Sequence, residues 1–365
     1  MMRRPRGLPP VRVDLINSIE GLDALRDKWR RLHALDAHAN IFTSWPWLRA
    51  WADVSPYPWA ILVAREDHTG EVAGLLPISP RGLGSAIRLD QVREIHFMGD
   101  EAADYRGFIC DPARQDQAVD AFADALAADR AWDRLVLKDA LDPRIDRFLD
   151  RLRIDDPALV VSMHRGNACP LLELPPTWDD YLGDRLTPPS RKSLKKRLRL
   201  AEEAGCTLTT TAGNGDMQQH LDALLHMAEV RGKNSPDHLQ ACRALFESCL
   251  AEGAAEIAVL WVGDDPAAAQ GSLIDRRAHS LGHYLAAFDG RFAPLSPGRV
   301  LDALCIRHAI ERGRAAVDFL RGDEAYKHQL GARARWTQHA WVRRRGWATR
   351  VRTTVSGIRA RLVRS

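Results

Sequence analysis

Two segments far apart in the chain follow one pattern of elements, and this repeat limits the fold more than any other feature. Residues 60–78 (AILVAREDHTGEVAGLLPI) and residues 258–275 (AVLWVGDDPAAAQGSLID) each predict a strand, a short polar turn and a second strand. Residues 119–139 and 301–323 then each predict an amphipathic helix followed by a strand. Short amphipathic units do resemble one another by chance, but the shared order of several elements favours a duplication.

The length of the chain agrees with two repeated lobes, because 365 residues are many for one hydrophobic core. The alternation of strands and helices predicts an α/β (α+β) fold in which each lobe is a mixed, twisted sheet flanked by helices. We place the boundary between the lobes near residues 163–168. The predicted organisation is an N-terminal extension with a first helix (1–34), two lobes (35–165 and 166–345) and a basic tail (346–365).

Composition excludes several classes of protein. The net charge of +4 is too small by itself to require nucleic acid. The six cysteines form no CxxC pair and have no zinc-like spacing with histidine, so we expect reduced thiols and no metal site. The basic N-terminus is not followed by an apolar stretch, and no run approaches 18 apolar residues. We therefore expect a cytoplasmic protein without a signal peptide or a membrane span.

The segment FDGRFAPLSPGRVLDALC (residues 288–305) predicts a helix start that suits an anion. Ser296 is a good N-cap residue, Pro297 fits the first turn, and Gly298 permits close approach to the backbone. The first turn of a helix offers unpaired N–H groups and the positive end of the dipole. Arg299 and Arg291 would add positive charge. The alternative interpretation is an ordinary helix start with no ligand.

The segment AVDFLRGDEAYKHQLGA (residues 316–332) gathers titratable side chains directly after an apolar strand. Strands that flank such a helix bring their C-terminal ends to one crevice, so Arg321 to Lys327 would lie beside the anion site. Asp318 lies inside the strand, where an unpaired carboxylate is costly, and we expect Arg321 or Lys327 to hold it. It is either a structural hydrogen-bonding group or a functional carboxylate with a shifted pKa. Tyr326 would either donate a proton or pack on the sheet edge.

Three local patterns carry a resemblance to a known family: FTSWPWLRAW (42–51), SPGRVLDALCIRHAIERG (296–313) and VDFLRGDEAYK (317–327). With the duplicated layout, they resemble the CelD-like group of the GNAT superfamily of acyl-CoA-dependent N-acyltransferases, which is akin to the FemAB proteins. The resemblance covers roughly residues 35–345 and implies tandem GNAT-like lobes. Of the family's glycine-rich phosphate loop, the second lobe keeps only Ser-Pro-Gly-Arg.

The resemblance implies that the second lobe binds the acyl donor, acetyl-CoA or another acyl-CoA, without a metal. The first lobe has CDPARQDQ (110–117) in place of the helix entry, so we expect a degenerate lobe that shapes the acceptor cleft. The acceptor would be an amine of a small molecule, a sugar or an envelope or polysaccharide precursor. A backbone N–H on the strand GHYLAAFD (282–289) would polarise the thioester carbonyl.

The resemblance also implies roles for individual residues. Asp318 would help to remove the amine proton and Tyr326 would protonate the departing thiolate, while His283 is a second candidate base or a core histidine. The remaining candidates are donor-binding residues (Ser296, Pro297, Gly298, Arg299 and Arg291) and substrate-binding residues (Arg321, Asp323, Lys327 and Tyr284).

Three alternatives stay open at this point. A FemAB-like transferase would take its acyl group from aminoacyl-tRNA, and the basic helix Arg191 to Arg199 could bind tRNA phosphates. That helix also fits a solvated face, and it lacks the interleaved aromatic residues typical of nucleic-acid binding, so we expect no DNA partner. A GNAT-like protein could also bind a ligand without catalysis. The tail 349–365 could form an amphipathic helix on an acidic membrane surface, dock on the body of the protein, or stay disordered.

Overall fold

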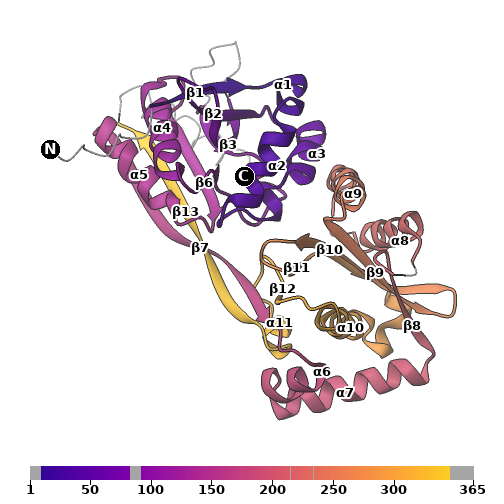
Figure 1. Ribbon diagram of the computed structural model, residues 1–365. Coiled ribbons are helices and arrows are strands. Elements are labelled where there is room, and N and C mark those ends of the chain that lie inside the picture. The colour runs from indigo at the N-terminus through magenta and orange to yellow at the C-terminus, as the bar shows by residue number, and fades with distance from the viewer. Residues whose placement is uncertain (1–9, 83–91, 214, 233, 346–365) are drawn as a thin grey trace, which may run out of the picture. The chain divides into compact units, whose positions relative to one another are not determined.

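The computed structural model describes residues 10–82, 92–213, 215–232 and 234–345. These residues divide into two compact units (Figure 1). Unit 2 comprises Asn167–Trp336, and unit 1 comprises the described residues up to Gly166 together with the stretch that begins at Thr337. Within the described ranges, no helix combines the length and the apolar character needed to cross a membrane. The predicted basic tail (346–365) lies outside the described residues.

Unit 1 is a mixed sheet with helices packed on it. Its strands follow the order β1-β2-β3-β4-β6-β13, and β5 pairs with β3. Its core gathers large side chains from several elements, including the fully buried Phe122, Trp132 and Phe148. The elements are β1 (Val11–Ile16), α1 (Ile19–Asp23), α2 (Arg26–Leu35), the 3₁₀ turn η1 (Ile41–Thr43), α3 (Trp45–Val54), β2 (Ala60–Glu66), β3 (Val72–Arg81), β4 (Glu94–Phe97), β5 (Ile109–Cys110), α4 (Gln115–Ala128), β6 (Arg134–Ala140) and α5 (Arg144–Asp155).

Unit 2 contains a second series of strands, in the order β7-β12-β11-β10-β9-β8, which also pair in both parallel and antiparallel ways. The elements are β7 (Leu159–Glu173), α6 (Trp178–Asp180), the π turn η2 (Tyr181–Arg185), α7 (Pro188–Glu203), β8 (Cys206–Thr210), α8 (Met217–Val230), α9 (Pro236–Ala251), β9 (Ala255–Val262), β10 (Asp265–Asp275), β11 (Ser280–Phe288), the 3₁₀ turn η3 (Gly290–Leu295), α10 (Pro297–Glu311), β12 (Ala316–Asp318), α11 (Ala325–Gln329) and β13 (Arg333–Arg344).

The two units share one strand topology, which confirms the prediction of two lobes with the same fold. In unit 1, β2 and β3 are antiparallel, β3 and β4 are antiparallel, and β4 runs parallel to β6. In unit 2, β9, β10, β11 and β12 repeat these relations in the same order. Helix α4 precedes β6 as helix α10 precedes β12. Laying residues 119–139 beside 301–323 in the sequence also predicts that Asp133 matches Asp318. This prediction was wrong, because Asp133 precedes the first residue of β6 whereas Asp318 is the last residue of β12.

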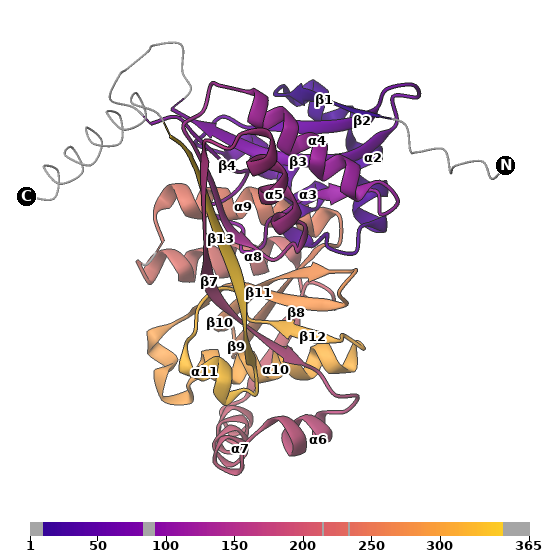
Figure 2. The same cartoon turned by 90° about the vertical axis from the view of Figure 1, so that its left-hand side faces the viewer.

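Each unit takes the strand next to β6 or β12 from a distant part of the sequence. Strand β13 pairs with β6 of unit 1, whereas β7 pairs with β12 of unit 2, each in an antiparallel way. Both strands continue from one unit into the other (Figure 2). The sequence predicted a second lobe that is one unbroken segment to residue 345, and the return of the chain to unit 1 at Thr337 was not predicted.

Helices cover both faces of the sheet in unit 2. Alternate residues of β9 point to opposite faces, so Ala258 and Leu260 pack with α10 while the other face meets α8 and α9 (Figure 1). Gly271 on β10 allows this close approach, because a Cβ at this position would lie 2.4 Å from Cζ of Phe246 on α9. Helix α10 is thereby fixed with its first turn next to the end of β11, where the candidate site lies.

Candidate functional site

Strands β11 and β12 separate shortly after they meet. They pair in parallel only from Ser280 to Gly282, opposite Ala316 to Asp318, and β12 ends there while β11 continues to Phe288. The last residues of β11 therefore present backbone groups to an edge that β12 does not cover. A bulge at Tyr284 interrupts the pairing of β11 with β10 in the same region.

A cavity of about 630 Å³ opens at this edge. Its size is in the range of sites for small molecules and cofactors. Its lining comes from the end of α8 and the loop after it, from β10 and β11, from the first turns of α10, and from the start of α11. The lining residues are Ala228, Arg231, Asn234, Ala269, Gln270, Ala286, Ala287, Phe288, Ala293, Ser296, Pro297, Gly298, Arg299, Leu301, Asp302, Glu324 and Tyr326.

The first turn of α10 forms one wall of the cavity, as the predicted helix start requires. Pro297 is the first helical residue and Ser296 is the N-cap. Ser296 has a left-handed backbone (φ 53°, ψ 53°), which is unusual for a residue other than glycine, and its hydroxyl makes no capping hydrogen bond. The predicted capping by this hydroxyl is therefore wrong. No side chain caps this turn, in which the N–H groups of Arg299 and Val300 donate to the carbonyl of Ser296 (2.9 and 3.2 Å). Gly298 and Arg299 both line the cavity.

Asp302 is a functional candidate that the sequence analysis missed. It lies on α10, lines the cavity and is only 9% exposed. Burial raises the pKa of its carboxyl to about 7, although Arg299 and Lys327 oppose this rise. In the sequence it is one acidic residue among the apolar residues of VLDALCI, a pattern that could have marked it as a buried carboxylate.

His283 lies next to Asp302. The Nδ1 atom of His283 is 3.8 Å from Oδ1 of Asp302, beyond hydrogen-bonding distance, and neither ring nitrogen has a hydrogen-bond partner among the described residues. Burial and, to a lesser extent, the nearby Lys327 lower the pKa of His283 to about 3. The imidazole is thus neutral near pH 7, and of this pair Asp302 is the group that can exchange a proton close to neutral pH.

Tyr326 lines the cavity from α11. Its ring packs edge-on against Phe319 at 6.2 Å, and the guanidinium of Arg299 lies 4.4 Å from the ring centre. Burial raises the pKa of its phenol above the usual value, an effect that Asp302 and Glu324 strengthen. The phenol therefore stays protonated near neutral pH and can donate a proton into the cavity.

Asp318 has a different place from the one predicted. It is not among the residues that line the cavity, and its carboxylate accepts hydrogen bonds from Arg335 (2.7 Å) and from the backbone N–H of Leu320 (2.9 Å). Arg335 is a partner that the sequence analysis did not predict, because β13 brings it to Asp318 from a later part of the chain. Of the four residues predicted to line one crevice (Asp318, Arg321, Tyr326 and Lys327), only Tyr326 lines the cavity.

Lys327 is a buried ammonium that holds the preceding loop. Its Nζ donates to the carbonyls of Arg321 (3.1 Å) and Gly322 (3.0 Å) and lies 2.9 Å from the carboxylate of Glu324. Burial tends to raise the pKa of Glu324, but the nearby Lys327 lowers it, and the net pKa is below its usual value. Glu324, which lines the cavity, is therefore an ionised carboxylate. The role of Lys327 in this arrangement is to fix Glu324 and the loop that leads to Tyr326.

His283 and three other predicted residues also lie outside the set that lines the cavity. Arg291 is exposed and pairs with Asp289 (2.8 Å) and Asp265 (3.3 Å). The carboxylate of Asp323 is 2.6 Å from His328, and the ring of Tyr284 packs against Phe246. Among the described residues, no three His, Cys, Asp or Glu side chains are grouped to hold a metal ion.

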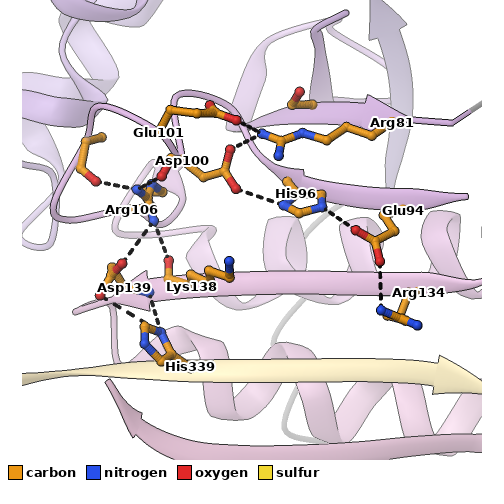
Figure 3. Close-up of polar contacts among 12 residues, drawn as sticks. Arg81, Glu94, His96, Asp100, Glu101, Arg106, Arg134, Lys138, Asp139 and His339 are labelled. Carbon is orange, nitrogen blue, oxygen red and sulfur yellow. Dashed lines mark hydrogen bonds and ion pairs between the residues drawn. The ribbon is translucent and has the colours of Figure 1, made fainter. Parts of the chain in front are cut away.

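The corresponding region of unit 1 is filled by a side chain. Beyond the end of β4, the buried guanidinium of Arg106 donates to the carbonyls of Lys138 (2.9 Å) and Asp100 (2.6 Å) and lies 3.5 Å from the carboxylate of Asp139 (Figure 3). The side chain of Asp100 in turn contacts His96 at 2.8 Å. Arg106 thus lies at the end of β6 in unit 1, whereas the cavity of unit 2 is lined by the end of β11 and the first turns of α10.

Comparisons with known proteins agree with this geometry. Residues 189–328, which carry the cavity, match a family model described as an acetyltransferase (GNAT) domain. No curated protein matches the chain. The chain is similar in fold to FemX (TM-score 0.61, 11% identity, 86% of this chain and 95% of that one).

Two further solved structures have the same overall fold. One is the C-terminal domain of a putative lysylphosphatidylglycerol synthetase from Agrobacterium fabrum (TM-score 0.56, 11% identity, 93% of this chain and 96% of that one). The other is L-PGS from Bacillus licheniformis (TM-score 0.56, 11% identity, 98% and 99%). At these identities the likeness concerns the fold alone. Residues 189–328 of this chain thus match the model of a GNAT acetyltransferase domain, and the splayed strands β11 and β12 lie within the matched segment.

Proposed function

We propose that the chain is an acyl-CoA-dependent N-acyltransferase whose reaction takes place in the cavity of unit 2. The observation that supports this most is the meeting of three features in one cavity: the uncapped first turn of α10, the carboxyl group of Asp302 with a pKa of about 7, and the protonated phenol of Tyr326. These are an anion-binding group, a base and an acid, which are the parts that acyl transfer from a phosphorylated thioester requires.

In the proposed mechanism, the thioester arm lies along the edge of β11 that β12 leaves uncovered, and a backbone N–H there polarises its carbonyl. The first turn of α10, with Ser296, Gly298 and Arg299, binds the pyrophosphate. The acceptor amine attacks the carbonyl carbon, and Asp302 takes the proton that the nitrogen loses. When the tetrahedral intermediate collapses, the C–S bond breaks and Tyr326 protonates the thiolate. Most of the rate enhancement comes from holding the two substrates together, on the order of 7–11 kcal/mol at best.

This mechanism replaces Asp318 by Asp302 as the base, because Asp302 lines the cavity and Asp318 is engaged by Arg335. His283 is not required to change its charge, since its pKa of about 3 keeps it neutral. It packs beside Asp302 and against the ring of Phe319, and we propose that it positions the carboxylate. The acceptor we propose is an amine on a small molecule, a sugar or an envelope precursor, with unit 1 as a lobe that binds no acyl donor.

A second candidate function is transfer from aminoacyl-tRNA. The observation that favours it is the exposed basic face of α7, where Lys192, Lys195, Lys196 and Arg199 face solvent. Such a face can bind the phosphate backbone of tRNA. An ordinary solvent-exposed helix face has the same basic side chains.

The test is incubation of the purified full chain with a panel of acyl-CoAs and amines, with detection of free thiol. Release of CoA that depends on an added amine is the expected result. A protein that binds no CoA ester at millimolar concentration, but releases the amino acid from aminoacyl-tRNA in the presence of an amine, would support the second candidate instead.

A further inference from the structure

A second cavity of about 320 Å³ lies next to the candidate site, and the two share Arg299 in their linings. Helix α7 lies beside α10 (Figures 1 and 2). It provides most of the residues that line this second cavity. The end of α11 closes it. Its lining residues are Pro189, Ser190, Ser193, Leu194, Arg197, Arg299, Gln329 and Leu330.

This second cavity is cationic and contains no carboxylate among the described residues that line it. Arg197 donates to the hydroxyl of Ser193 (2.6 Å), and Arg299 donates to the side-chain oxygen of Gln329 (3.3 Å). Both acceptors are neutral, so neither guanidinium is neutralised by these bonds. The two charges also repel each other: burial lowers the pKa of Arg299, and Arg197 lowers it further despite the opposing effect of Asp302.

Two guanidinium groups and two serine hydroxyls around one cavity are suited to a tetrahedral oxyanion. Guanidinium groups donate pairs of hydrogen bonds to phosphate, and hydroxyls can complete the set. An added dianion would also remove the repulsion between Arg197 and Arg299. A neutral or cationic ligand would gain neither effect.

We propose that this second cavity binds the ribose 3′-phosphate of the acyl donor, with Arg197 as its main ligand and Ser190, Ser193 and Arg299 as further donors. The inference rests on the proposed function. An acyl-CoA carries a pyrophosphate and one separate phosphate monoester at its nucleotide end. If the first turn of α10 binds the pyrophosphate, the monoester is the phosphate left over, and the cavity on the far side of Arg299 is the adjacent cationic site.

The experiment compares CoA with dephospho-CoA, which lacks only the 3′-phosphate, by titration calorimetry on the full chain. Adenosine 3′,5′-bisphosphate serves as a third probe that lacks the thiol arm. The variant is Arg197→Gln, and the matched control is Arg199→Gln, which makes the same change at an exposed position on the same helix outside both cavities.

The wild-type protein should bind CoA about tenfold more tightly than dephospho-CoA, which is the effect of losing a charge-assisted contact. Arg197→Gln should abolish this preference while its affinity for dephospho-CoA stays unchanged, and Arg199→Gln should keep the preference. Arg197→Gln should likewise weaken the binding of adenosine 3′,5′-bisphosphate.

The possible failures separate the two proposals. Equal affinity of the wild type for CoA and dephospho-CoA, or a preference that survives Arg197→Gln, would overturn the phosphate site and leave the proposed function standing. If neither CoA nor dephospho-CoA binds, the proposed function fails together with this inference.

Discussion

Asp302 and His283 lie 3.8 Å apart inside unit 2, and burial moves their pKa values in opposite directions, to about 7 for the carboxyl and about 3 for the imidazole. Both groups are therefore driven towards their neutral forms by the same cause, the loss of solvent. Near pH 7 the imidazole is neutral and the carboxyl is half ionised. This relationship gives the cavity one titrating group in the physiological range, and the first two predictions follow from it.

The first prediction concerns the pH dependence of turnover. If Asp302 takes the amine proton, turnover should rise as pH increases through about 7, because only the ionised carboxylate is a base. Asp302→Asn should lower turnover by about 10²–10⁴-fold, the range typical of a positioned base, and should remove this limb of the profile. The control is Asp264→Asn, at an exposed position in the turn between β9 and β10. An unchanged profile in Asp302→Asn would exclude the carboxyl as the base.

The second prediction is that the same variant is more stable than the wild type above neutral pH. The folded-state pKa of Asp302 is raised from 3.8 to about 7, so the native state holds a proton that the unfolded chain releases. The native state is thus favoured below the unfolded pKa, and this advantage is lost as pH rises from about 4 to 7. Asn carries no such charge, so Asp302→Asn should raise the free energy of unfolding at pH 8, by up to about 4 kcal/mol for a three-unit shift. Denaturant unfolding at pH 5 and pH 8 measures it, and a larger gain at pH 5 would contradict it.

The third prediction concerns Tyr326. Tyr326→Phe keeps the ring that packs on Phe319 and under Arg299, and it removes only the hydroxyl. The melting temperature and CoA affinity should stay close to those of the wild type, while turnover falls by at least about 10²-fold if the phenol protonates the thiolate. Substrates with a more acidic leaving thiol should suffer less, since their thiolate needs less help to depart. A loss that is the same for every leaving group would argue for a packing role.

The fourth prediction assigns a structural role to Asp318. Its carboxylate holds Arg335 and the N–H of Leu320, and Asn can replace only part of this pairing. Asp318→Asn should therefore lower the melting temperature, with a loss of roughly 1–3 kcal/mol, while activity per folded molecule is retained. Arg335→Gln should have a similar effect, and the double variant should cost less than the sum of the two single variants. A strong loss of turnover in Asp318→Asn without destabilisation would restore the catalytic role suggested by the sequence.

The contrast between Asp302 and Asp318 shows which features of the site can be predicted from the sequence. The hairpins, the helix start at Pro297 and the position of Tyr326 depend on neighbours in the chain, and the local pattern predicted them. The partner of Asp318 depends on β13, which pairs across the fold, and strand pairing between distant segments leaves no local pattern. Asp302 was missed because its importance comes from burial beside His283 on another element. The exchange of β7 and β13 between the units was missed for the same reason as Arg335.

The fifth prediction tests donor binding at the start of α10. A Cβ at Gly298 would have only Phe288 within 4 Å, at 3.6 Å, which is an ordinary contact, and Gly298 does not have a positive φ. Gly298→Ala should therefore fold normally and could gain up to about 1 kcal/mol, because alanine favours a helix over glycine. Both Gly298 and Phe288 line the cavity, so the added methyl group would stand in the space proposed for the pyrophosphate. CoA affinity should fall while thermal stability rises.

The control is Gly313→Ala, at a left-handed position after the end of α10, which should lower stability and leave the affinity of the folded protein unchanged. If Gly298→Ala binds CoA as tightly as the wild type does, the phosphates do not approach this turn.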